Sequence, residues 1–62
     1  MCESIAYLVS DKGEEKIMEN VVYAVPSKNS VFLEDILGDQ KVVEGVLKEI
    51  KLLDHKILIQ KQ

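Results

Sequence analysis

The first two residues of the chain bring together the groups best suited to metal chemistry. Cys2 is the only cysteine among 62 residues, and it follows directly on Met1. The Met1 amine, the deprotonated Cys2 amide nitrogen and the Cys2 thiolate would form two fused five-membered chelate rings. This planar nitrogen and sulfur set suits Ni(II) or Cu(II), whereas Zn(II) prefers tetrahedral sites. If Met1 is removed, the Cys2 amine and thiolate would chelate instead.

A planar site of this kind needs a fourth donor. In a symmetric dimer, the second copy of Cys2 would supply it. The competing interpretation is that a short protein simply begins Met-Cys, with no metal role for the thiol. The residues alone leave both interpretations open.

The other residues capable of chemistry are poorly placed for it. His55 is the only histidine, Asp54 is its only acidic neighbour in sequence, and we expect a turn histidine with no metal role. Glu14-Glu15 and Glu34-Asp35 are acidic pairs, but adjacent residues of a strand point to opposite faces. The phosphate-binding and HExxH motifs are missing from the sequence. These observations predict a protein that is not an enzyme.

The charge argues against nucleic acid as the main partner. The chain has a formal charge of −3, with eight lysines and no arginine. A phosphate-binding surface normally shows a basic excess and uses arginine. A small RNA-binding barrel is nevertheless the alternative hypothesis, because five lysines lie in the second half: Lys41, Lys48, Lys51, Lys56 and Lys61. For that alternative, Lys48 and Lys51 are the candidate contacts.

The three aromatic residues also bear on this alternative. Tyr7, Tyr23 and Phe32 are spread along the sequence. A base-stacking platform needs aromatic side chains gathered on one exposed face beside basic residues. We therefore expect all three rings in the hydrophobic core.

The sequence pattern predicts that the elements that position these residues are short strands. Residues 4–11 are apolar on both faces, which predicts a strand buried on both sides or one that makes a subunit contact. A turn follows at 12–15. Residues 16–26 predict a strand pair or one long bent strand, with the bend at Glu19-Asn20. A loop at 27–30 leads to a strand from 31, and Gly38-Asp39 gives another turn.

The segment 41–53 is ambiguous. Its apolar residues fit one face of a helix, but Gly45 weakens a helix and would suit a strand that bends at a bulge. Asp54-His55 then predicts a turn, and 56–60 a strand. Several short strands with turns about every 8–12 residues indicate a small all-β sandwich or barrel.

Length limits what this barrel can do alone. We expect residues 1–62 to form a single domain, which buries only about 60% of its unfolded surface. Domains this small usually need a staple, and because one cysteine cannot close an internal disulfide, a metal or a homodimer is expected. There is no long apolar run for a membrane span and no signal peptide. One free cysteine suits a reducing compartment, which predicts a cytoplasmic protein.

Four segments in order carry a family resemblance: MCESIAYLV, KIMENV, LEDILGDQK and GVLKEIKLLDHKILI. With these segments the sequence resembles the CooT-like family of small proteins, which are often described as predicted RNA-binding proteins. The resemblance covers essentially the whole chain. It implies an all-β fold, a small SH3-like or Sm-like β-barrel of about five to seven short strands, and a homodimer. It thus favours strand over helix for residues 41–53.

The resemblance also implies a function. The best-known branch of the family binds Ni(II) through the N-terminal cysteine at the dimer interface and helps to insert nickel into carbon monoxide dehydrogenase. Carried to this sequence, the metal residues are Cys2, Met1 and Glu3, with Met1 and Glu3 supplying backbone or terminal donors. The expected function is a nickel metallochaperone with a nickel enzyme as client. The resemblance implies no role for His55.

Overall fold

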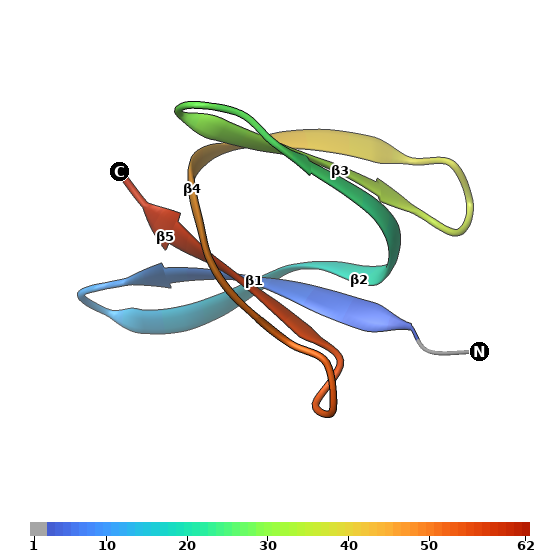
Figure 1. Cartoon of the computed structure of the whole chain (residues 1–62), viewed down its shortest axis with the longest axis horizontal. Helices are drawn as coiled ribbons and strands as arrows, with labels where there is room; N and C mark the ends of the chain where they lie inside the picture. The colour runs from blue at the N-terminus through green and yellow to red at the C-terminus, as the bar shows by residue number, and fades with distance from the viewer. Residues whose placement is uncertain (1–2) are drawn as a thin grey trace.

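The computed structural model describes residues 3–62 and shows five strands. They form a closed barrel in chain order (Figure 1). The strands are β1 (Ser4–Ser10), β2 (Gly13–Pro26), β3 (Ser30–Asp35), β4 (Gln40–Lys51) and β5 (Lys56–Lys61). The predicted all-β fold, a small barrel of five short strands, is confirmed. Within the described residues there is no helix of the length and apolarity needed to cross a bilayer.

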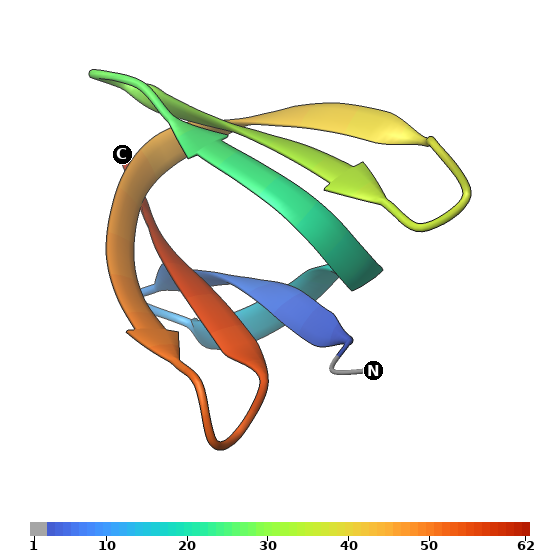
Figure 2. The same ribbon diagram turned by 45° about the vertical axis from the view of Figure 1, so that its right-hand side comes forward.

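One parallel pairing closes the ring. Strands that follow one another in the chain pair antiparallel, while β1 and β5 pair parallel, from Ile5 opposite Lys56 to Val9 opposite Gln60. Figure 2 shows β4 curving round from β3 to run beside β5. The first and last strands therefore support each other, and closure leaves neither of them as a free sheet edge.

The second strand is the long bent strand that the sequence allowed. Its first half pairs with β1 and its second half with β3. The bend lies at Asn20, which has a positive φ of 56°, and the register against β3 shifts between Val21 and Tyr23. Asparagine tolerates this left-handed backbone better than most residues. The strand also begins earlier than predicted, at Gly13, so the expected turn at 12–15 is shorter.

Residues 40–51 form a strand throughout, so the helical alternative for this segment is wrong. The first half of β4 pairs with β3, up to Glu44 opposite Ser30, and the second half pairs with β5 from Gly45 opposite Lys61. The ladder hydrogen bonds on both sides outweigh the helical spacing of the apolar residues. The predicted bulge at Gly45 is also wrong, because the register shift lies between Leu47 and Glu49.

Gly45 allows β4 to approach β5 closely; it does not form a bulge. A Cβ atom at this position would lie 2.5 Å from the Gln60 carbonyl oxygen and 2.9 Å from Cγ2 of Ile59. The Gln60 oxygen is backbone of the paired strand, so it cannot move away without separating β4 from β5. The crossing of these strands therefore requires a residue without a side chain.

A Gly45→Ala variant is expected to lose about 1–3 kcal/mol of unfolding free energy, the usual cost of overpacking. Urea denaturation followed by circular dichroism measures this loss. Glu44→Ala is the control, because Glu44 is exposed in the same strand. A Gly45→Ala variant as stable as the control would contradict the close-packing explanation.

The core is small and aliphatic. Its buried members are Ala6, Val21, Val31, Leu33, Ile57 and Ile59. None of the three aromatic residues belongs to it, so their predicted burial in the core is wrong. Tyr23 is 56% exposed, and Tyr7 and Phe32 are only partly buried. The interior of a five-stranded barrel is narrow, and aliphatic side chains from alternate strand positions already fill it.

Candidate metal centre

Of the three predicted metal residues, the structure describes one. Met1 and Cys2 lie outside the described residues. Glu3 is the first described residue, and it is exposed directly before β1. The structure near the candidate site is therefore that of β1, the strand that follows Glu3.

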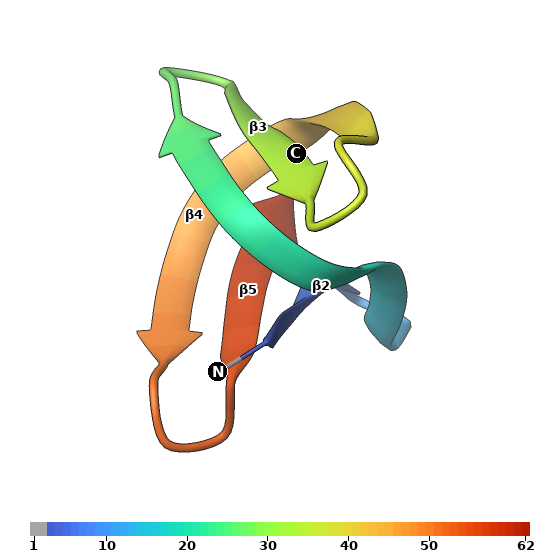
Figure 3. The ribbon, with the colours of Figure 1, turned by 90° about the vertical axis from the view of Figure 1, so that its right-hand side faces the viewer.

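The start of β1 is held on both sides by its neighbours. Ser4 pairs with Val21 in β2. On the other side, the Ile5 N–H donates a hydrogen bond to the His55 carbonyl oxygen at 2.8 Å. Figure 3 shows this arrangement, with the β4–β5 turn extending past the start of β1. The chain that leaves Cys2 thus enters a fixed backbone position within two or three residues.

The β4–β5 turn contributes His55 and two exposed leucines to this end of the barrel. His55 adopts a positive φ of 56° and is exposed, so the predicted turn at Asp54-His55 is confirmed. Leu52 and Leu53 in the same turn are 79% and 95% exposed. Val22, next to Val21 on β2, is also more than half exposed. Apolar surface therefore flanks the start of β1 on both sides.

The acidic pair Glu34-Asp35 serves local structure. The Asp35 carboxylate oxygen Oδ1 accepts hydrogen bonds from the backbone N–H groups of Leu37 (2.9 Å) and Asp39 (3.0 Å), which closes the β3–β4 turn. Glu34 accepts a hydrogen bond from the Gln40 side-chain amide at 3.3 Å. Among residues 3–62, no three His, Cys, Asp or Glu side chains come together as a metal site would require.

One surface ion pair shifts the pKa of both of its members. The Lys16 ammonium donates to the Glu19 carboxylate on β2. This hydrogen bond, aided by the opposite charge, lowers the pKa of Glu19 and raises the pKa of Lys16. Both side chains are more than half exposed, so the pair acts as a solvated contact beside the bend of β2.

The candidate RNA contacts, Lys48 and Lys51, lie on other strands than the aromatic pair Tyr23 and Phe32. Lys48 lies at the β4 bulge, and Lys51 is opposite Lys56 on β5. The Lys56 ammonium lies 5.4 Å from the centroid of the Tyr7 ring. The Tyr23 and Phe32 rings, by contrast, lie together on β2 and β3. Tyr7 is thus the ring that lies beside these lysines, whereas Tyr23 and Phe32 lie on strands that do not pair with the second half of β4.

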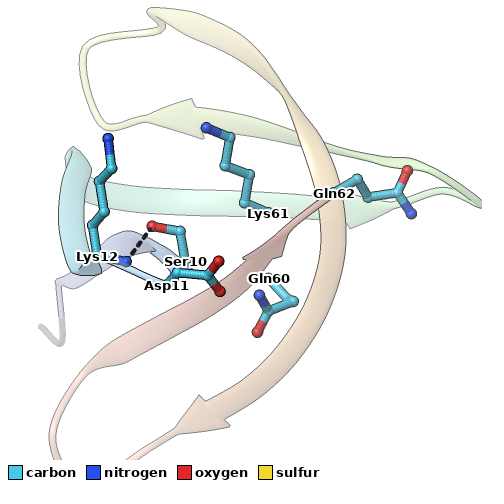
Figure 4. A pocket seen from close by; sticks show the side chains of 6 residues that line it. All are labelled: Ser10, Asp11, Lys12, Gln60, Lys61 and Gln62. Atoms are coloured by element: carbon cyan, nitrogen blue, oxygen red, sulfur yellow. Dashed lines mark hydrogen bonds between the residues drawn. The ribbon is translucent and has the colours of Figure 1, made fainter.

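A polar hollow of about 320 Å³ lies at the other end of β1. It is lined by Ser10, Asp11, Lys12, Gln60, Lys61 and Gln62 (Figure 4). The Lys12 backbone N–H donates to the Ser10 hydroxyl at 3.3 Å, and the ammonium groups of Lys12 and Lys61 extend to the same side. Glu3, the described member of the predicted metal residues, does not line this hollow.

Comparisons with known proteins agree on one family. The profile of the family described as "CO dehydrogenase accessory protein CooT" matches residues 1–60. The chain is 35% identical over 60 residues to an uncharacterized protein of Methanothermobacter thermautotrophicus, covering 97% of this chain and 89% of that protein. The crystal structure of a protein assigned as CooT from Carboxydothermus hydrogenoformans is 34% identical, covers 98% of each chain, and superposes with a TM-score of 0.86. The chain therefore belongs to the CooT family of CO dehydrogenase accessory proteins.

Proposed function

We propose that this protein is a non-enzymatic Ni(II) carrier for the maturation of carbon monoxide dehydrogenase. It acts as a single-domain homodimer in the cytoplasm, and Cys2 of each copy binds the metal. The observation that carries the proposal is the family match, which extends over residues 1–60 and so includes the Met1-Cys2 pair. An accessory role for that enzyme also supports an enzyme client.

The donor set follows from local chemistry. The Cys2 thiolate is a soft, strong ligand for Ni(II), and the nitrogen donors are the Met1 amine and the Cys2 amide. The partner's thiolate would supply the fourth donor, and Glu3 would provide no side-chain ligand. Because the thiol must lose its proton to bind, nickel affinity rises with pH across the titration of the thiol.

Exposed apolar side chains near the start of β1 support the shared site. Two thiolates can share one nickel ion only if the two-fold axis passes close to both N-termini. Val22, Leu52 and Leu53 provide exposed apolar surface on either side of the strand that follows Cys2. Burial of this surface between two copies would hold the N-termini together.

A Ni(II) titration of the reduced, tag-free protein tests the proposal. We expect thiolate-to-nickel charge-transfer bands and planar d–d absorption that saturate at one nickel for two chains. A titration without these bands would reject the nickel proposal. Saturation at one nickel per chain would keep nickel binding but reject the shared site.

A further inference from the structure

An apolar patch lies on the outer face of β2, β3 and β4, the part of the barrel at the top of Figure 2. We call it the exterior patch; its residues are Tyr23, Val25, Phe32 and Val42. Val25, Phe32 and Val42 lie in one row across the three strands, each opposite the next. The Tyr23 ring packs edge-on against Phe32, with centroids 6.1 Å apart. Four large side chains thus form one continuous surface.

The patch faces away from the core. Val31 and Leu33 are fully buried in the barrel, so Phe32 between them points to the opposite side of β3. Val42 is 65% exposed and Tyr23 56% exposed. The fold does not need these side chains inside the barrel. Apolar surface that gathers on one face of a soluble protein marks an interaction site.

Acidic groups border the exterior patch. Glu34 lies two residues after Phe32 on β3, and Glu44 two residues after Val42 on β4, so both point to the same outer face. Lys41 alternates with Val42 and faces the other side, where its Nζ donates to the Ile17 carbonyl oxygen at 3.3 Å. The patch is therefore apolar at its centre and negative along β3 and β4.

We propose that the exterior patch docks a protein partner that presents bulky apolar side chains flanked by lysine or arginine. A second copy of this chain fits poorly, because it would present the same acidic border and no basic side chain within the patch to complement Glu34 and Glu44. Lys28, in the turn between β2 and β3, lies only at the end of the face. Nucleic acid fits poorly as well, since its phosphates would meet the carboxylates. The docking proposal does not depend on nickel binding.

Selection from a random peptide display library tests the proposal. The unmodified protein is the bait, and a Val42→Glu variant serves for counter-selection. We expect enriched peptides that combine large apolar residues with lysine or arginine. Fluorescence polarisation of the best labelled peptide should show binding about ten-fold or more weaker to Val42→Glu. Ile50→Glu, at an apolar residue that is 50% exposed on the half of β4 that pairs with β5, should bind like the unmodified protein.

Charge reversal tests the acidic border separately. A Glu34→Lys, Glu44→Lys double variant should bind the selected peptide about ten-fold more weakly and should prefer a version whose basic residues are replaced by glutamate. Circular dichroism confirms that each variant keeps the barrel. If Val42→Glu does not fold, Tyr23→Glu replaces it, because Tyr23 is also exposed.

Several results would overturn the proposal. One is a selection that enriches no peptide, or peptides whose binding survives both patch variants. A second is a homodimer, seen by sedimentation, that Val42→Glu converts to a monomer, which would assign the patch to a second copy. A third is salt-dependent binding of an RNA oligomer that Val42→Glu abolishes. All variants retain Cys2, so the nickel titration is judged independently of these results.

Discussion

Replacing Cys2 with serine is expected to weaken Ni(II) binding by about a hundred-fold or more. A serine hydroxyl stays protonated at neutral pH and is a hard, weak donor, whereas the thiolate is a soft, anionic one. Loss of even an outer partner of a metal ligand costs about 10–100-fold, so loss of the ligand itself should exceed that. Competition with a chromophoric nickel chelator measures the affinity, and circular dichroism should show an unchanged barrel.

A relocated thiol provides the matched control. In a Cys2→Ser, Ser10→Cys variant the protein again has one cysteine, but at the opposite end of β1. The thiol there has no neighbouring terminal amine, so the fused chelate rings cannot form. We expect nickel affinity to stay low. Restored affinity would show that any accessible thiol suffices and would contradict the terminal chelate.

The largest expected change in stability comes from Leu33→Ala. Leu33 is fully buried and is among the largest core side chains. Truncating a buried leucine costs about 2–5 kcal/mol. A domain of this size has only about 3–9 kcal/mol of unfolding free energy, at 0.05–0.15 kcal/mol per residue. The variant should therefore be substantially unfolded at temperatures where the natural chain is folded.

Thermal and urea denaturation at one fixed chain concentration measure this effect, because dimer formation would make the midpoint concentration-dependent. Leu37→Ala is the matched control, the same chemical change at a residue that is 84% exposed. We expect its effect to stay within about 0.5 kcal/mol. Equal losses in the two variants would mean that Leu33 does not anchor the core.

Local patterns in the sequence were enough to predict most of the strands. Turns at Gly38-Asp39 and Asp54-His55, and the bend in β2, were predicted because short-range backbone preferences determine them. Residues 41–53 were ambiguous, because Val43, Val46, Leu47 and Ile50 satisfy helical spacing. Only pairing with β3 and β5 decides for a strand, and that pairing is a tertiary contact which the spacing within residues 41–53 does not reveal.

The misplaced aromatic residues have a similar cause. Alternation in β3 predicts two faces, but it does not say whether Phe32 or the pair Val31 and Leu33 turns inward. The narrow interior of a five-stranded barrel decides that question. Since Tyr23 and Phe32 were expected in the core, the exterior patch was missed. Its sequence signal was that Phe32 and Val42 each stand two residues before a glutamate, Glu34 or Glu44, so that apolar and acidic side chains share one face of each strand.

The candidate metal residues can be predicted from the sequence because the donor atoms belong to two adjacent residues, Met1 and Cys2. The residues that hold the start of β1 in place, by contrast, come from distant parts of the sequence. Val21 and His55, which flank the start of β1, are separated from it by about 17 and 50 residues of sequence, and only the barrel brings them together. The sequence therefore predicts the donors but not the surface around them.

The parallel pairing of β1 with β5 has a consequence for synthesis on the ribosome. β1 emerges first, but the carbonyl that accepts the Ile5 N–H belongs to His55, and the strand it pairs with begins at Lys56. This contact spans nearly the whole chain, and long-range closure is slow. A chain stalled before residue 56 therefore has β2 as the one possible neighbour of β1. The second side of β1 would be paired only once β5 has been made.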